Sequence, residues 1–385
     1  MAIRPAEAEQ HPLAVAVRAV ERIWAAYPDV GFLRYRPEQI AWQTRGIAES
    51  DASDTLVLVR PHLQAGGLEV FVRALDRDVR EWVEAGLKAG ELRAVVGLVL
   101  LDFPTAFASD ADDYLRKGLA ARDQWLGHPL IGFSIAPHAP YTVSDTSFGR
   151  ALAMADELTL PIHLHVHETA REIDESMALH GVRPLARLAR LGVLGENLIG
   201  VHAVHLDDAD LELLARHDCS VAHCPTSNMK LASGIAPVPR LVGAGLRVGL
   251  GTDGAASNNR LDLIQEMRHA ALLAKVGSMD ASALPAHAVL RMATLDGARA
   301  LGLGEHIGSI ESGKFADLCA VDLGALDCQP CFEPVSHLVH VAGREHVSHV
   351  WVNGETRVDK GIRLLHINDS ELLRLASMWQ TKVGN

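Results

Sequence analysis

The chain has 385 residues, 48% of them hydrophobic, and a formal net charge of −12 at neutral pH. That length suffices for one large domain with a smaller one appended, and the acidic balance argues against nucleic acid as a partner, because phosphate binding needs clustered basic residues. No apolar run reaches roughly 18 residues, so we expect no membrane span and no membrane partner. Five cysteines and an N-terminus without a signal pattern predict a cytoplasmic protein without a disulfide framework.

Between residues 91 and 305 the sequence alternates short apolar runs with amphipathic stretches. The runs predict buried strands, and the stretches between them predict helices because their apolar residues recur at helical spacing. This alternation indicates parallel strands joined by crossover helices, and strands in such a long series favour a (β/α) barrel over an open sheet. The expected strands are 92–101, 130–136, 160–166, 197–204, 219–224 and 246–253, and the expected helices are 145–160, 183–192, 208–217 and 259–275.

The two ends of the chain depart from this pattern. Residues 306–385 contain short apolar segments with glycine-containing turns, including Asn353-Gly354, and predict a small C-terminal β-domain followed by a terminal helix. Residues 1–90 hold helical pieces but few strand patterns and form an atypical N-terminal region, either diverged or frame-disrupted. We therefore expect three parts, with boundaries at 1–90, 91–305 and 306–385.

Polar residues that bind metals or transfer protons follow the predicted strands. In a barrel the carboxyl ends of all strands open onto one mouth, where the active site lies. Histidine and aspartate together at such a rim are ligand types of zinc or a similar divalent ion. The residues concerned are His138, His163, His165, His167, Glu168, His202, His205, His223 and Asp253.

Each of these residues also has a structural interpretation. A histidine at the end of one strand is often a buried, hydrogen-bonded residue of the core, and Asp253 can instead cap the following helix or form an Asx turn. His163, His165 and His167 alternate along one strand, so their spacing does not decide which of them reaches a metal. A purely structural role would have to be found separately for the polar residues at each of five strand ends, whereas one metal site explains them together. The pattern therefore favours a metal site.

Other catalytic signatures are absent from the sequence. His167-Glu168 does not continue into an HExxH motif, and there is no HxE…PCxxC pair, P-loop or GxSxG elbow. Cys328 and Cys331 form a CxxC that stands alone in the C-terminal region, and we interpret it as incidental.

Several segments resemble the amidohydrolase superfamily, and within it the 5′-methylthioadenosine/S-adenosylhomocysteine deaminases, relatives of the triazine chlorohydrolases. The resemblance implies an α/β fold, the metal-dependent hydrolase (β/α)8 TIM-like barrel with a small C-terminal β-sandwich domain. It also implies hydrolytic deamination of an adenine nucleoside and one divalent metal ion, most simply zinc. The segments are 136–145, 163–176, 200–206, 222–238, 250–275 and 307–318.

The resemblance implies roles for matching positions. His165 and Asp253 are the implied metal ligands, and Asp253 also accepts a proton from the attacking water. Glu168 is the implied acid/base, and His202 is expected to orient the water. The implied partner is the small nucleoside, and a homo-oligomer is a further expectation. The implied substrate contacts are His138, Glu168, Asp253 and Ser257.

The first quarter of the chain departs from the family pattern. The family has an HxH motif on its first barrel strand, and both histidines bind the metal, but this chain has no HxH before residue 163. Only His11 and His62 precede residue 128, and Arg60 stands where the first histidine of the pair would lie. We therefore expect a barrel that is incomplete at its first strand, with weakened metal binding. Two alternatives stay open: another amidohydrolase, such as a triazine-type chlorohydrolase or guanine deaminase, and a catalytically impaired pseudoenzyme.

Overall fold

The computed structural model describes residues 92–105 and 107–364, with residues 370, 373, 374 and 377 nearer the C-terminus. The expectations for residues 1–90, including the missing first strand, lie outside these residues, as does most of the expected terminal helix. No helix in the described part is long and apolar enough to cross a membrane.

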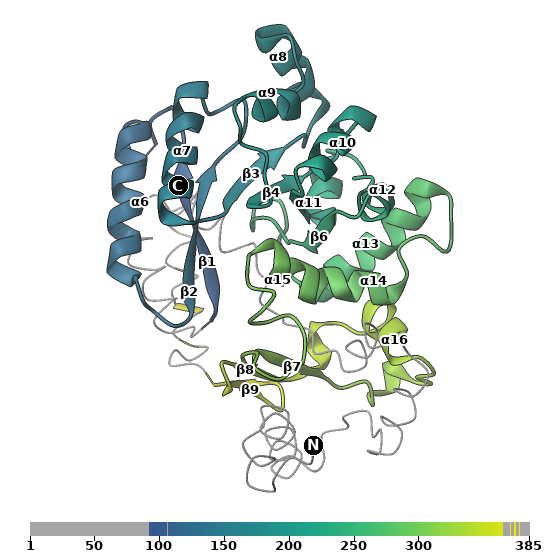
Figure 1. Ribbon diagram of the computed structural model, residues 1–385. Helices are drawn as coiled ribbons and strands as arrows, with labels where there is room; N and C mark the ends of the chain where they lie inside the picture. The colour runs from purple at the N-terminus through teal and green to yellow at the C-terminus, as the bar shows by residue number, and fades with distance from the viewer. Residues whose placement is uncertain (1–91, 106, 365–369, 371–372, 375–376, 378–385) are drawn as a thin grey trace, which may run out of the picture.

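A parallel sheet of six strands forms the larger part of the described structure (Figure 1), in the order β1-β2-β3-β4-β5-β6. Each strand pairs in parallel with its neighbour in sequence, as strands joined by crossover helices do. This order is that of consecutive barrel strands, and all the predicted strands are confirmed. They are β1 (Ala94–Leu100), β2 (Ile131–Pro137), β3 (Ile162–Val166), β4 (Leu198–His202), β5 (Ser220–His223) and β6 (Arg247–Leu250).

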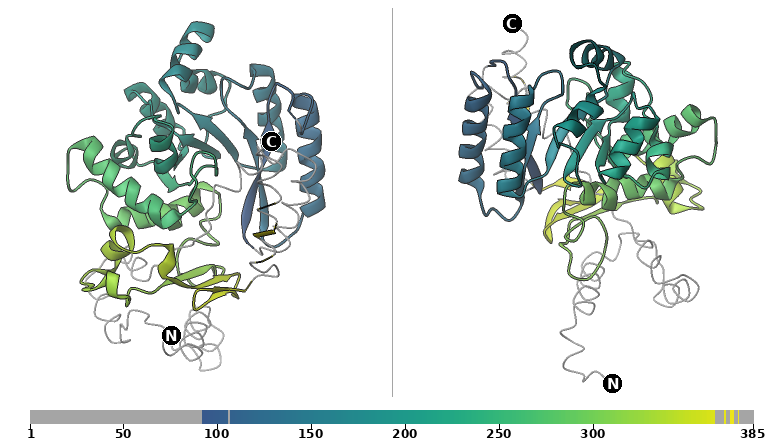
Figure 2. Two further views of the ribbon diagram at one scale, coloured as in Figure 1. Left: turned by 180° about the vertical axis from the view of Figure 1, so that it is seen from behind. Right: turned by 45° about the horizontal axis from the view of Figure 1, so that its top comes forward.

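Helices cover the outer face of this sheet. Figures 1 and 2 show α6 (Ala111–Trp125) and α7 (Asp145–Leu158) side by side, and they pack on β1 and β2 respectively. Of these two, the sequence predicted only α7, which is confirmed. The other three predicted helices are also confirmed, and an aspartate caps two of them by accepting a backbone N–H. These three are α9 (Pro184–Arg190), α10 (Asp208–Arg216) and α13 (Leu263–Ser278).

The sequence did not predict the remaining helices of the barrel. Most of them are single turns or little longer, too short for helical periodicity to show. They are α8 (Ala170–His180), α11 (Pro225–Lys230), α12 (Val238–Gly243), α14 (Ala286–Arg291), η2 (Met292–Asp296) and α15 (Gly297–Ala300).

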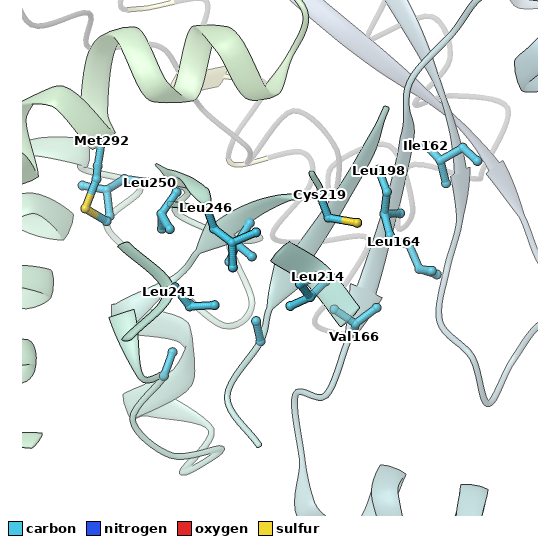
Figure 3. Packing of buried hydrophobic residues seen from close by; sticks show 14 of the residues in the cluster. Ile162, Leu164, Val166, Leu198, Leu214, Cys219, Leu241, Leu246, Leu250 and Met292 are labelled. Carbon is cyan, nitrogen blue, oxygen red and sulfur yellow. The ribbon is translucent and has the colours of Figure 1, made fainter. Parts of the chain in front are cut away.

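Branched and straight apolar side chains fill the space between sheet and helices. Figure 3 shows Leu164 of β3 and Leu198 of β4 near Leu214 of α10, and all three are fully buried. A close approach of backbones completes the packing at β6, where a Cβ added to Gly249 would lie 3.0 Å from the Cα of Gly297. A side chain at Gly249 would therefore push α15 away from the sheet.

The C-terminal β-domain is also present, as an antiparallel sheet of four strands in the order β10-β9-β8-β7. The predicted turn Asn353-Gly354 joins β8 to β9 with φ values of 53° and 82°, the positive values that a tight hairpin turn requires. The described residues form one sheet layer here, and α16 (Pro334–His340), which the sequence did not predict, packs against α13 and α14. The strands are β7 (Leu318–Val321), β8 (Val347–Val352), β9 (Glu355–Asp359) and β10 (Ile362–Arg363), with short turns η3 (Leu326–Cys328) and η4 (Arg344–His346).

Arg93, directly before β1, connects the barrel to this second sheet. Its Nε donates to Asp317 Oδ2 at 2.6 Å, and its guanidinium carbon lies 4.4 Å from the centre of the Phe315 ring. Both charged side chains are almost fully buried. The pair fixes the start of β1 against the segment that leads into β7, because separating the two side chains would leave each buried charge without its partner.

Candidate functional site

Side chains from three strand ends converge at the mouth of the barrel. His165 lies near the end of β3, His202 ends β4, and Asp253 follows β6. One ligand atom of each lies within 4.8 Å of the other two, and His202 and Asp253 are buried. The sequence predicted that these three residues converge within reach of one ion, with His165 and Asp253 as the ligands and His202 as the residue that orients the water.

The backbone of His202 turns its side chain toward His165. In the parallel register His202 pairs with Val166, so regular alternation would direct its ring to the face opposite His165. Its φ of 73° departs from strand geometry, and the two rings lie nearly parallel with centres 5.4 Å apart. A positive φ outside glycine costs on the order of 1–3 kcal/mol and is typical of functional sites, where surrounding contacts enforce it.

Hydrogen bonds fix which nitrogen of each ring faces the mouth. His165 Nδ1 lies 2.7 Å from the His138 backbone oxygen, and His202 Nδ1 lies 2.9 Å from Asn228 Oδ1. Because both partners are acceptors, each Nδ1 carries the proton and each Nε2 keeps its lone pair. Burial is the main cause that lowers the pKa of His165, which also favours the neutral ring. Two imidazoles are thereby ready to bind a cation.

Two serine hydroxyls hold the Asp253 carboxylate. Its Oδ2 accepts from Ser257 Oγ at 2.6 Å and from Ser227 Oγ. The alternative that Asp253 only caps a helix is wrong, since Asp262 caps α13. Ser257 was expected near the substrate, and in the structure its buried hydroxyl is directed at Asp253.

Glu168 lies beside this group. Its Oε2 is 3.8 Å from His202 Nε2, and its Oε1 accepts from Ser233 Oγ at 3.3 Å. The buried Glu172 holds the backbone below it by accepting the N–H groups of His167 and Glu168 at 3.1 and 2.9 Å. The carboxylate of Glu168 is thus positioned close to the convergent atoms while staying partly exposed.

His138 lies on the loop after β2, which a buried arginine fastens. Arg187 donates to the backbone oxygens of Pro140 and Val143 at 2.5 and 3.1 Å. The His138 ring meets Tyr141 edge-on with centres 6.0 Å apart, and burial lowers the pKa of His138 to about 4. His138 is therefore neutral near pH 7. Its ring centre lies 5.1 Å from that of His165, so it can contribute to the site as a hydrogen-bonding or stacking group.

Of the remaining strand-end histidines, His167 and His205 are hydrogen-bonded to the backbone, and His163 and His223 have no assigned role. His167 Nδ1 donates to the His205 backbone oxygen at 3.1 Å while its Nε2 accepts from Leu185 N at 3.1 Å, so both nitrogens are used. His205 Nε2 donates to the Ser233 backbone oxygen at 2.7 Å. His163 and His223 are outside the convergent group, and burial lowers the pKa of each to about 3.

A second group of metal-capable atoms lies in the C-terminal domain, formed by Asp327, Cys328 and His346. His346 Nδ1 accepts the Gly343 backbone N–H at 3.0 Å, so its Nε2 carries the proton and donates to Asp327 Oδ1 at 3.1 Å. A metal would need the lone pair of that nitrogen. This cluster is therefore a hydrogen-bonded pair beside a thiol, in keeping with the incidental CxxC.

The residues that hold the site were missed by sequence reasoning. Ser227 and Asn228 contact Asp253 and His202, and Glu172 supports Glu168. A signal existed for the first two, since the polar run Thr-Ser-Asn follows a strand end, where a barrel places its mouth. Glu172 gave no signal, because an acidic residue in the first turn of a helix is ordinary.

The raised pKa of Glu172 predicts a pH effect on stability. Burial raises its pKa from 4.5 to about 7, so the unfolded chain releases this proton first as the pH rises. The folded state loses about 3 kcal/mol of stabilisation between pH 4.5 and 7. Glu172→Gln, which cannot titrate, should not show that loss. Urea unfolding at pH 5 and pH 8 measures it, with the exposed Glu157→Gln as control; equal pH dependence of both variants and the unmodified chain would contradict the assignment.

Comparison with known proteins assigns the family. The model of the amidohydrolase family matches residues 67–357. The chain belongs to the amidohydrolase family. The model of the fifth domain of the uridylyltransferase GlnD matches residues 13–46, outside the described part.

Similar proteins come from several bacteria. A 5-methylthioadenosine/S-adenosylhomocysteine deaminase of Teredinibacter turnerae is 46% identical over 77% of this chain and 67% of its own length. The same enzyme of Saccharophagus degradans is 43% identical over 78% and 67%. The crystal structure of an adenosine deaminase from Xanthomonas campestris with bound zinc matches with a TM-score of 0.74 and 48% identity, over 76% of this chain and 66% of that one. This chain thus spans about two thirds of the length of these relatives.

More distant structures share the fold. Atrazine chlorohydrolase TrzN from Arthrobacter aurescens has a TM-score of 0.71 at 23% identity. At that identity the likeness concerns the barrel and not the chemistry.

Proposed function

We propose that this protein is a metal-dependent hydrolase that deaminates adenine nucleosides and releases ammonia. The observation that carries the proposal is the convergence of His165, His202 and Asp253, with Glu168 beside them, at one barrel mouth. The relatives from Teredinibacter turnerae and Saccharophagus degradans described above are deaminases of 5-methylthioadenosine and S-adenosylhomocysteine, and we assign these nucleosides as the substrate class.

The residues present fit a zinc ion. Two imidazoles with available Nε2 lone pairs and one carboxylate make the His-and-carboxylate set of catalytic zinc sites. His165, His202 and Asp253 would hold the ion. When bound, the ion would lower the pKa of a water molecule and so make it a better nucleophile. The bonds from His165 to the His138 oxygen and from His202 to Asn228 are the outer contacts that orient such ligands.

The protein groups then move the protons. Asp253, oriented by Ser227 and Ser257, accepts a proton from the attacking water. Glu168, whose side chain is partly exposed, donates a proton to the purine nitrogen beside the attacked carbon. The water oxygen bonds to that carbon, and Asp253 passes its proton to the amino group, so that the carbon–nitrogen bond breaks and ammonia leaves. The remaining hydroxyl proton returns to Glu168 as the carbonyl forms. His138 and Ser257 complete the proposed substrate-binding side chains.

Other features extend the proposal. The net charge of −12 supports a small-molecule substrate rather than nucleic acid, and we infer no membrane partner. The described cysteines are all free, four of them buried, which supports a cytoplasmic location. We also propose that the chain forms a homo-oligomer, and sedimentation of the purified protein tests this.

A second candidate is a catalytically impaired protein, favoured by the absence of an HxH motif before residue 163. Zinc content and ammonia release from 5′-methylthioadenosine decide between the two. One zinc per chain with turnover on the order of 10 per second supports the deaminase. No zinc and no ammonia supports the impaired protein, and chloride release from a triazine or ammonia from guanine alone would support another amidohydrolase activity.

A further inference from the structure

A buried carboxylate joins the two segments that support the candidate metal ligands. Glu266, in the first turn of α13, is fully buried. Its Oε2 accepts the backbone N–H of Thr226 at 3.0 Å, and its Oε1 accepts from Asn258 Nδ2 at 2.8 Å. Thr226 belongs to α11, which follows β5, and Asn258 belongs to the loop of residues 251–262, called here the β6 loop. Glu266 thus contacts both segments at once.

Each segment sets the position of a metal-capable group. From α11, Asn228 accepts the proton of His202 Nδ1 at 2.9 Å, and Ser227 donates to Asp253. The β6 loop carries Asp253 itself, and Asn258 Nδ2 also donates to the Thr252 backbone oxygen at 2.8 Å, one residue before it. A shift of α11 against the β6 loop therefore changes the separation of His202 and Asp253.

A second link between the same segments is exposed. Lys230 Nζ donates to the Ala256 backbone oxygen at 2.7 Å and to Asn259 Oδ1 at 2.6 Å. An exposed lysine contributes little because solvent competes for it. Two hydrogen bonds to a buried carboxylate are stronger and hold their geometry. Glu266 therefore adds two buried hydrogen bonds to this junction, beside the direct bond from Ser227 to Asp253.

We infer that Glu266 is a positioning residue for the metal centre: it fixes α11 against the β6 loop and thereby keeps His202 and Asp253 at ligand separation. This inference rests on the proposed metal site. A carboxylate is required because both of its partners are N–H donors, so each of its oxygens must accept. Glutamine at this position would turn an NH2 group toward one of the two donors.

The test compares Glu266→Gln with Glu172→Gln in the full chain. Both residues are buried glutamates that accept two N–H groups, but Glu172 supports the backbone of Glu168 and not a metal ligand. Zinc affinity is measured by competition with a chromophoric chelator. Amide hydrogen exchange of the metal-free chains is measured by mass spectrometry, and unfolding midpoints establish that the variants are folded. Asn258→Ala, which removes one half of the link, replaces Glu266→Gln if that variant does not fold.

We expect Glu266→Gln to weaken zinc binding about 10- to 100-fold, as loss of outer contacts does at metal sites, while Glu172→Gln stays within about twofold of the unmodified chain. Faster exchange should appear in residues 226–230 and 252–258 of Glu266→Gln alone. Unchanged exchange in those segments overturns the inference whether or not zinc binds, as does equal loss of zinc affinity in both variants. Failure of the unmodified chain to bind zinc, with the exchange difference intact, counts against the metal site and not against the link.

Discussion

Replacing Asp253 with asparagine should remove zinc from the protein and abolish deamination. The substitution keeps the shape of the side chain and its contacts with Ser227 and Ser257, so the β6 loop should keep its fold. It removes a charge that both binds the ion and accepts the proton of water. We expect zinc affinity to fall at least about 100-fold and the rate of ammonia release to fall by on the order of 10⁴-fold.

The control is Asp174→Asn, an exposed aspartate on α8. Metal analysis after gel filtration and a coupled ammonia assay with 5′-methylthioadenosine give the two quantities for both variants. Retention of stoichiometric zinc by Asp253→Asn, at the affinity of the unmodified chain, would show that the ion binds elsewhere.

Glu168→Gln should separate chemistry from metal binding. Its carboxylate lies 3.8 Å from His202 Nε2, outside bonding distance of the convergent atoms, so zinc should stay bound. The amide cannot donate the proton that the purine nitrogen requires. Loss of a general acid of this kind lowers kcat by roughly 10²- to 10⁴-fold, with a smaller change in KM.

Glu175→Gln is the matched control, since Glu175 is a half-buried residue of α8 that pairs with Arg171. Steady-state kinetics with 5′-methylthioadenosine, beside zinc analysis of each variant, measure the effect. A kcat for Glu168→Gln within threefold of the unmodified chain would remove Glu168 from the proton-transfer role.

The strands could be predicted because their signal is local. A strand of a parallel sheet is buried on both faces and reads as a continuous apolar run, as in residues 130–136 and 197–204. The short helices could not be predicted, because the six residues of α11 or α12 show less than two turns of periodicity. Their place is set by contacts with the strands before and after them.

The rim position of the functional residues could also be predicted, but not which of them meet. Three alternating histidines, two on β3 and one directly after it, look equivalent in sequence. Only the structure shows that both ring nitrogens of His167 are hydrogen-bonded to the backbone of Leu185 and His205, while His165 faces the mouth. The side chain of His202 lies beside His165 because the backbone of His202 has a positive φ, which the pattern of residue types does not predict. Contacts such as that of Glu266 with Thr226 join residues 40 positions apart, beyond the range of local patterns.

The pairing of Arg93 with Asp317 bears on how the chain is made. These partners are separated by 224 positions, so the arginine emerges from a ribosome long before its aspartate. Until Asp317 has been synthesised, the Arg93 guanidinium at the start of β1 lacks the carboxylate that compensates for its burial. Contacts of such sequence separation form late and slowly, and partly made barrels expose sheet edges that associate with other chains. Synthesis that stalls before residue 317 should therefore leave a nascent chain that depends on chaperones, whereas the six-stranded sheet itself is complete once residue 250 has emerged.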